Sequence, residues 1–166
     1  LKNDISEQEM KRFCEEAISL NVKMVAINSS QTKYCKELLR NSLVRVGAAI
    51  SFPLGQTTIE TKVFETLDAI KNGADEIDYV INLSKLKSGD YTYIEEEMKA
   101  IVTVCREHTV TSKVIFENCL LSDDEKIKLC EIANEVKPDY VKTSTGFSHS
   151  GATVEDVQLM RKICHP

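Results

Sequence analysis

Apolar residues follow two different spacings along this chain, and the two spacings alternate from one end to the other. Short apolar runs predict five strands, at residues 22–28, 44–50, 76–81, 111–116 and 140–142. Between these runs the apolar residues recur every three to four positions, which is the spacing of a helix with one buried face. The pattern therefore predicts five strands, each followed by a helix, and one further helix before the first strand.

Polar residues stand where the predicted helices should begin. Two segments, residues 6–9 and 122–125, have the Ser-x-x-Glu spacing of a capping box, and they open helices that reach about residues 20 and 136. A helix over residues 91–107 should follow a loop at residues 85–90. Three more helices are expected to begin at the capping residues Ser30, Thr58 and Thr153.

Strands that alternate with helices pair in parallel through right-handed crossovers, so the fold class is α/β. Two architectures fit, a doubly wound open sheet and a (β/α)8 TIM barrel. The loop at residues 28–31 lacks the glycine-rich fingerprint of dinucleotide-binding sheets, and ionisable residues in several consecutive strands favour the barrel. A barrel needs eight strands, so we expect residues 1–166 to form one partial barrel domain of about five βα units, strands 2–6, with the other strands outside the chain.

Composition narrows the class of protein further. The net charge is -5 without a basic cluster, which disfavours binding to nucleic acid or to an anionic membrane. No apolar run approaches the roughly 20 residues that a membrane span needs, and the start of the chain does not resemble a signal peptide. We therefore expect a protein without a membrane partner.

The cysteines and histidines bear on location and on metal binding. The six cysteines form no CxxC pair, so we expect reduced thiols and a cytoplasmic location. His108, His149 and His165 show no metal-ligand spacing. The sequence therefore predicts no metal site.

Three of the predicted strands carry an ionisable residue toward one interior. Lys142 ends the last strand, and small hydroxyl residues and Gly146 follow it directly. Asp78 and Lys113 lie inside two other apolar runs. Residues two apart in a strand share a face, so these three side chains converge if their strands are neighbours. An isolated buried ammonium is very costly, so such groups are paired, shifted in pKa, or both.

An amine at a strand end suits covalent catalysis. Lys142 would attack a carbonyl to give a carbinolamine and then a Schiff base, while Asp78 would move protons through water. The alternative is a structural Asp–Lys pair at the strand ends, with Lys113 as an ordinary strand-edge charge. Thr145 and its neighbouring hydroxyls could satisfy loop backbone groups or help to hold an anionic substrate.

Several segments also resemble one family in order along nearly the whole chain. These segments are residues 51–55, 73–78, 86–90, 113–117, 119–121, 141–147 and 151–156. They are similar to the deoxyribose-phosphate aldolases, class I aldolases with a (β/α)8 fold. The resemblance implies reversible cleavage of 2-deoxy-D-ribose 5-phosphate to glyceraldehyde 3-phosphate and acetaldehyde.

The resemblance also implies roles for single residues. Lys142 matches the Schiff-base lysine and Asp78 the proton-relay carboxylate, while Lys113, Thr145 and Gly146 match substrate-binding positions. No metal or organic cofactor is implied, the partners are a phosphorylated sugar and aldehydes, and we expect a homodimer.

The chain departs from the family pattern in places. A further family lysine and most of the phosphate-binding loops would lie beyond residue 166, and Ala26 stands where a cysteine is common. Two alternative functions follow. The chain could be a truncated, inactive barrel fragment that acts only through protein contacts, or a different Schiff-base enzyme of transaldolase type.

Overall fold

The computed structural model describes residues 1–164 and contains one parallel sheet of five strands. The strands are β1 (Met24–Asn28), β2 (Arg45–Ile50), β3 (Glu76–Val80), β4 (Thr111–Ile115) and β5 (Tyr140–Lys142). Neighbouring strands in the sheet are also consecutive in the chain. A doubly wound sheet reverses its strand order at a switch point, and this sheet has no such reversal within residues 1–164.

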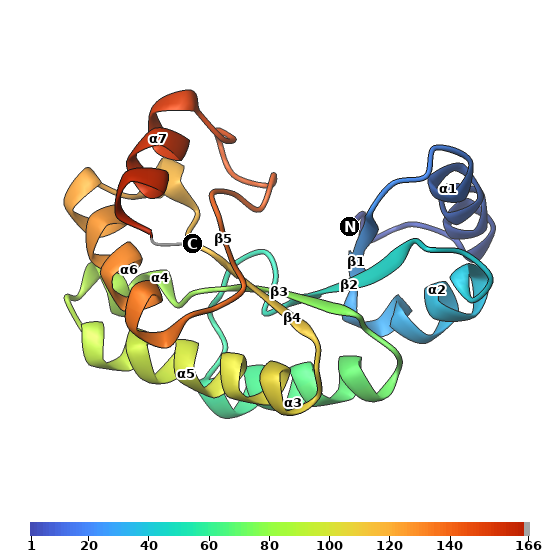
Figure 1. The fold of residues 1–166 in the computed structure, drawn as a ribbon, viewed down its shortest axis with the longest axis horizontal. Helices are drawn as coiled ribbons and strands as arrows, with labels where there is room; N and C mark the ends of the chain where they lie inside the picture. Colours follow the sequence, from blue (N-terminus) through green and yellow to red (C-terminus); the bar gives the residue numbers. More distant parts are fainter. Residues whose placement is uncertain (165–166) are drawn as a thin grey trace.

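The helices connect the strands and form an arc around the sheet (Figure 1). They are α1 (Glu7–Ser19), α2 (Thr32–Leu39), α3 (Ile59–Lys71), α4 (Leu83–Lys87), α5 (Tyr91–Glu107), α6 (Asp123–Val136) and α7 (Val154–Ile163), with 3-10 turns η1 (Ser29–Gln31) and η2 (Asn118–Leu120). Right-handed crossovers between consecutive neighbours place successive helices on the same face. The expected α/β class with a parallel sheet is confirmed.

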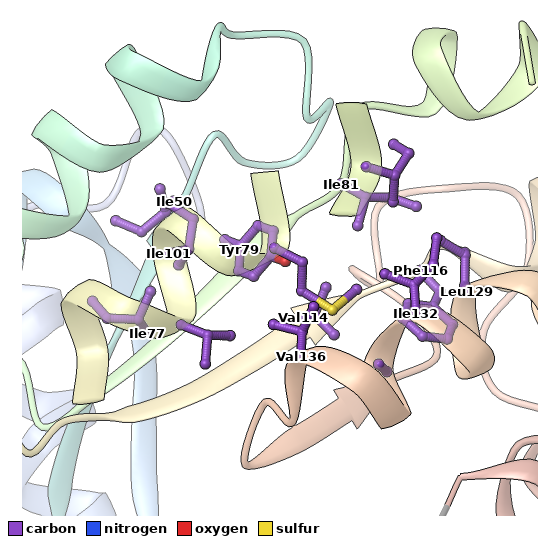
Figure 2. Packing of buried hydrophobic residues seen from close by; sticks show 14 of the residues in the cluster. Ile50, Ile77, Tyr79, Ile81, Ile101, Val114, Phe116, Leu129, Ile132 and Val136 are labelled. Carbon is purple, nitrogen blue, oxygen red and sulfur yellow. The ribbon is translucent and has the colours of Figure 1, made fainter. Parts of the chain in front are cut away.

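The two faces of the sheet have different chemistry. Ile77, Tyr79 and Val114 point into the main hydrophobic core beneath the helices, as Figure 2 shows. The residues between them in β3 and β4 alternate to the other face, where Asp78 lies in register with Lys113. One strand therefore supplies both the core and a charged interior, which explains why all of β3 is buried.

A second, smaller core lies under the first part of the chain. Its buried residues come mainly from α1, β1 and α2, and they include Met10, Ile27 and Leu39. The main core instead gathers residues from β2 to β4 and from α3, α5 and α6. Strand β2 contributes to both cores, through Val46 and Ile50, and joins them.

Most predicted helix starts are correct and two local predictions are wrong. Ser6 and Ser122 form capping boxes as expected. Ser30 does not cap α2, because residues 29–31 form a 3-10 turn and the helix begins after Gln31 without a side-chain cap. The predicted loop at residues 85–90 is partly helical, since α4 spans Leu83–Lys87; such a short helix leaves too few residues for a helical apolar pattern.

Within residues 1–164, none of the helices combines the length and apolar character that crossing a bilayer requires. All six cysteines are free thiols, and four of them are buried. Burial raises the pKa of Cys105 to about 12, so this thiol stays protonated at neutral pH.

Candidate active site

Lys142 is the last residue of β5, and its amine lies at the charged interior of the sheet. Its Nζ donates a hydrogen bond of 2.9 Å to Asp78 Oδ2, which is 64 residues earlier in the chain. The Asp78 side chain is 5% exposed, whereas that of Lys142 is 33% exposed. The amine is therefore accessible from solvent while its carboxylate partner is held inside.

Lys113 approaches the other oxygen of the same carboxylate. Its Nζ lies 3.0 Å from Asp78 Oδ1 and 2.5 Å from Glu76 Oε2. The contact with Asp78 Oδ1 is an ion pair without hydrogen-bond geometry, and no residue in the described part of the chain donates to that oxygen. One oxygen of Asp78 is thus bound to Lys142, and the other is buried beside the Lys113 ammonium.

Thr145 and Gly146 lie in the loop that follows Lys142, and the structure places them differently. Thr145 is buried; its backbone N–H donates to Glu117 Oε1 at 3.0 Å, and its hydroxyl donates to Glu117 Oε2. The same hydroxyl accepts from Phe147 N at 3.0 Å. Gly146 is exposed with φ of +86°, and an added Cβ would meet no atom within 4 Å. The loop therefore presents open backbone at Gly146 and a fully engaged hydroxyl at Thr145.

Glu117 is a functional candidate that the strand pattern did not reveal. The predicted strand at residues 111–116 stops just before it; in the structure β4 ends at Ile115 and Glu117 has φ of +58°. This left-handed turn directs the buried carboxylate to the loop after β5. The available signal was an acidic residue directly after a buried apolar run.

Arg45 and Glu76 also belong to the charged interior. Arg45 Nη1 lies 3.1 Å from Glu76 Oε1, and the Glu76 side chain is 5% exposed. Glu76 stands two residues before Asp78 in β3, so its shared face was visible in the sequence. The pairing of Glu76 with Arg45 could not be predicted from the sequence, because it depends on which strand lies next to β3.

A buried ion pair supports the strand that carries Asp78. Lys62 of α3 and Glu97 of α5 are 2.6 Å apart with side chains 0% exposed, and Lys62 Nζ also donates to Val80 O at 2.6 Å. Glu97 accepts from Asn82 N at 3.0 Å. Burial lowers the pKa of Lys62 and raises that of Glu97, and the partner's charge opposes both shifts. This pair fixes the exit of β3 against two helices.

Other candidate ligands are remote from this arrangement. His108 and His149 are exposed, and His165 lies outside the described residues. Within residues 1–164 no group of three or more His, Cys, Asp or Glu side chains is placed to hold a metal ion. A surface hollow of about 1140 Å³ lies at the amino end of β5 beside Pro138 and Tyr140, and Lys142 does not line it.

The arrangement can perform amine chemistry. The accessible amine of Lys142 contacts the buried carboxylate of Asp78, and the ammonium of Lys113 contacts the other oxygen of that carboxylate. An amine next to a proton acceptor can attack a carbonyl, and the same carboxylate can return the proton when water leaves.

Comparisons with known proteins agree with this chemistry. The model of the DeoC/LacD family aldolases matches residues 1–165. A deoxyribose-phosphate aldolase from Lactobacillus acidophilus is 60% identical over 163 residues, which cover 98% of this chain and 69% of the relative. One from Caldanaerobacter subterraneus is 49% identical and is covered to 71%.

Solved structures show the same arrangement of elements. A putative deoxyribose-phosphate aldolase from Coccidioides immitis superimposes with a TM-score of 0.94 at 31% identity, over 98% of this chain and 64% of that one. A tetrameric deoxyribose phosphate aldolase from Aeropyrum pernix gives 0.89 at 25% identity, over 98% and 68%. The chain spans about two thirds of the length of these relatives. The match along nearly the whole chain shows that it belongs to the DeoC/LacD aldolase family.

Proposed function

We propose that this chain acts as a Schiff-base aldolase that cleaves 2-deoxy-D-ribose 5-phosphate reversibly to D-glyceraldehyde 3-phosphate and acetaldehyde. The observation that carries the proposal is the 2.9 Å contact between Lys142 Nζ and Asp78 Oδ2. The substrate class is supported by the relatives named as deoxyribose-phosphate aldolases. The same names give no support to a chain that acts only through protein contacts.

Imine formation is the first step. Lys142 gives up a proton, and its nitrogen attacks the C1 aldehyde of the open-chain sugar to form a carbinolamine. Asp78 returns a proton to the carbinolamine hydroxyl, directly or through water, so that water leaves and a protonated imine remains. The 2.9 Å distance between Lys142 Nζ and Asp78 Oδ2 supports this step, because proton transfer needs a hydrogen-bond distance.

Carbon–carbon cleavage follows from the electron demand of the imine. A base removes the C3 hydroxyl proton, the C2–C3 bond breaks, and its electron pair moves to the iminium nitrogen to give an enamine. Glyceraldehyde 3-phosphate leaves with the new C3 carbonyl. Protonation of the enamine at C2 and hydrolysis then release acetaldehyde and regenerate Lys142.

Substrate binding is assigned to the groups around this amine. Lys113 offers a cation whose side chain is 15% exposed, which suits an electron-rich hydroxyl or phosphate oxygen. Gly146 offers open backbone in the loop after Lys142. Thr145 is proposed to act through the shape of that loop, since its hydroxyl proton already goes to Glu117.

Reduction with borohydride in the presence of acetaldehyde or deoxyribose 5-phosphate tests the proposal. A stable adduct on Lys142 is expected by mass spectrometry, and it should disappear in Lys142→Ala. Lys128→Ala is the control, because Lys128 is an exposed lysine with its own ion pair to Glu131. Absence of an adduct on a well-folded chain would overturn the assignment.

We also propose that residues 1–166 form a single partial barrel domain, whose five βα units correspond to strands 2–6 of a (β/α)8 barrel. The consecutive strand order and the arc of helices support this. A crystal structure of the protein as cells make it is expected to show a closed ring of eight strands, and an open sheet would contradict it. A homodimer and a cytoplasmic location remain predictions. Light scattering measures the molar mass in solution and so tests the homodimer.

A further inference from the structure

Five charged side chains of alternating sign form a row across four neighbouring strands. Arg45 of β2 contacts Glu76 at 3.1 Å, and Glu76 contacts Lys113 of β4 at 2.5 Å. Lys113 contacts Asp78 at 3.0 Å, and Asp78 contacts Lys142 of β5 at 2.9 Å. The first three links join adjacent strands, and the link from Asp78 of β3 to Lys142 of β5 reaches across β4.

Lys113 is shared between two carboxylates, and Glu76 is the nearer of them. Both contacts are ion pairs; the contact with Glu76 is 2.5 Å, whereas the contact with Asp78 is 3.0 Å. Both carboxylates are almost completely buried, so solvent screens these interactions weakly. The recorded hydrogen bond of the Asp78 carboxylate is the one that it accepts from Lys142.

Glu76 is itself anchored from the other side. Arg45 Nη2 donates to Asp75 O at 2.9 Å and to Thr111 Oγ1 at 3.1 Å, while its Nη1 meets Glu76. The guanidinium is thereby held at the amino ends of β3 and β4. Such an anchor keeps the Glu76 carboxylate in one position.

We propose that Glu76, held by Arg45, is a positioning residue for the aldolase reaction. Because Glu76 forms the closer ion pair with Lys113, the Asp78 carboxylate can exchange protons with the Lys142 amine. This inference rests on the proposed function, and it assigns to Glu76 no contact with substrate.

The physical reason is competition for one carboxylate. Without the Glu76 charge, Lys113 has Asp78 as its remaining partner in the row and moves onto it. Asp78 is then drawn away from Lys142, and the proton transfers of imine formation become slower. Small misplacements of catalytic groups are enough to lower rates by about a hundredfold.

Glu76→Gln tests the inference because it removes the charge and keeps the shape. We expect kcat to fall by about tenfold to a hundredfold with little change in KM. The pH profile of borohydride trapping should also move to lower pH, since removing an anion favours the neutral form of nearby amines. Glu76→Asp keeps the charge and should restore the profile.

Arg45→Gln is a second test variant, and the charge that it removes has the opposite sign to that of Glu76. It removes a cation from the same row, so its trapping profile is expected to move to higher pH. This variant carries the test if Glu76→Gln does not fold. Glu131→Gln, at an exposed ion pair with Lys128, is the control and should leave both kcat and the profile unchanged.

A double-mutant cycle shows whether Glu76 acts through Lys113. In a Lys113→Met background, Glu76→Gln should have no further effect on kcat, because the competing ammonium is gone. Equal losses in both backgrounds, or unchanged profiles in both charge variants, would overturn the inference. Failure of the wild-type chain to trap an adduct at Lys142 would instead refute the proposed function, so the two failures are distinguishable.

Discussion

Glu117 and Thr145 hold the loop that follows Lys142, the proposed Schiff-base lysine. The Glu117 carboxylate accepts from both the backbone and the hydroxyl of Thr145, and it has no ion-pair partner among residues 1–164. Asn118 N donates to Thr143 O at 2.8 Å, which ties the same two loops together a second time. At the scale of single residues, the site thus depends on a carboxylate that need not touch substrate.

Glu117→Gln tests this role. The amide presents one acceptor oxygen where the carboxylate presents two, so one bond to Thr145 is lost, at a cost of about 1–3 kcal/mol in the free energy of unfolding. We expect a lower melting temperature and a KM for deoxyribose 5-phosphate raised several-fold, measured by thermal denaturation and steady-state kinetics.

Thr145→Val is the matched variant for the same pair. If the Thr145 hydroxyl serves Glu117, this variant and Glu117→Gln should have similar effects, and the double variant should be no worse than either. A Thr145→Val variant of normal stability with a raised KM would show instead that the hydroxyl contacts the substrate.

At the scale of elements, strand β3 is held by two helices as well as by its neighbours. The Lys62–Glu97 pair joins α3 and α5 and binds the backbone at both Val80 and Asn82. Burial lowers the pKa of Lys62 and raises the pKa of Glu97, so it favours the neutral form of both groups. Each charge is therefore stabilised by the charge of its partner. The exit of β3, two residues beyond Asp78, is therefore sensitive to this pair.

Removing one partner of this pair should be worse than removing both. Glu97→Gln leaves the Lys62 ammonium buried without a counter-charge and is expected to lower the free energy of unfolding by about 3–5 kcal/mol. Lys62→Met with Glu97→Gln removes that charge, and the new amide can still accept from Asn82 N, so most of the stability should return. Urea denaturation measures both; a double variant less stable than Glu97→Gln would contradict the argument.

At the scale of the whole molecule, the chain has two cores joined through β2. The smaller core belongs to α1, β1 and α2, and the larger core lies beneath β3 and β4, which carry Asp78 and Lys113. Regions with fewer buried apolar contacts open at lower free energy. Asp78 and Lys113 therefore stand on the strands that pack against the larger core.

Hydrogen exchange tests this division. Amides of β1 and α2 are expected to exchange faster than those of β3 and β4, as measured by mass spectrometry. Ile27 and Ile77 are both 0% exposed strand residues, one in each core, and form a matched pair. Ile27→Ala should accelerate exchange mainly in the smaller core, whereas Ile77→Ala should weaken the whole molecule; uniform protection in the wild type would refute two units.

Local patterns predict most of the elements and single out Lys142 as a candidate. Apolar spacing and capping residues identify the five strands and most helix starts, because both depend on residues a few positions apart. The same reasoning missed α4 and misplaced the start of α2, where the helix is short or lacks a side-chain cap. It marked Lys142, Asp78 and Lys113 because each stands in or at the end of an apolar run.

The sequence by itself determined the alternation of strands and helices, the charged face of β3 and the amine at the end of β5. Only the tertiary structure decided which charges meet. In the tertiary structure Arg45 contacts Glu76, and Lys113 contacts two carboxylates. Glu117 accepts a hydrogen bond from the Thr145 hydroxyl. The physical reason is that ionic and hydrogen-bond contacts act over about 3 Å. Their partners lie 28 to 64 residues apart and come within that range only through strand order and register.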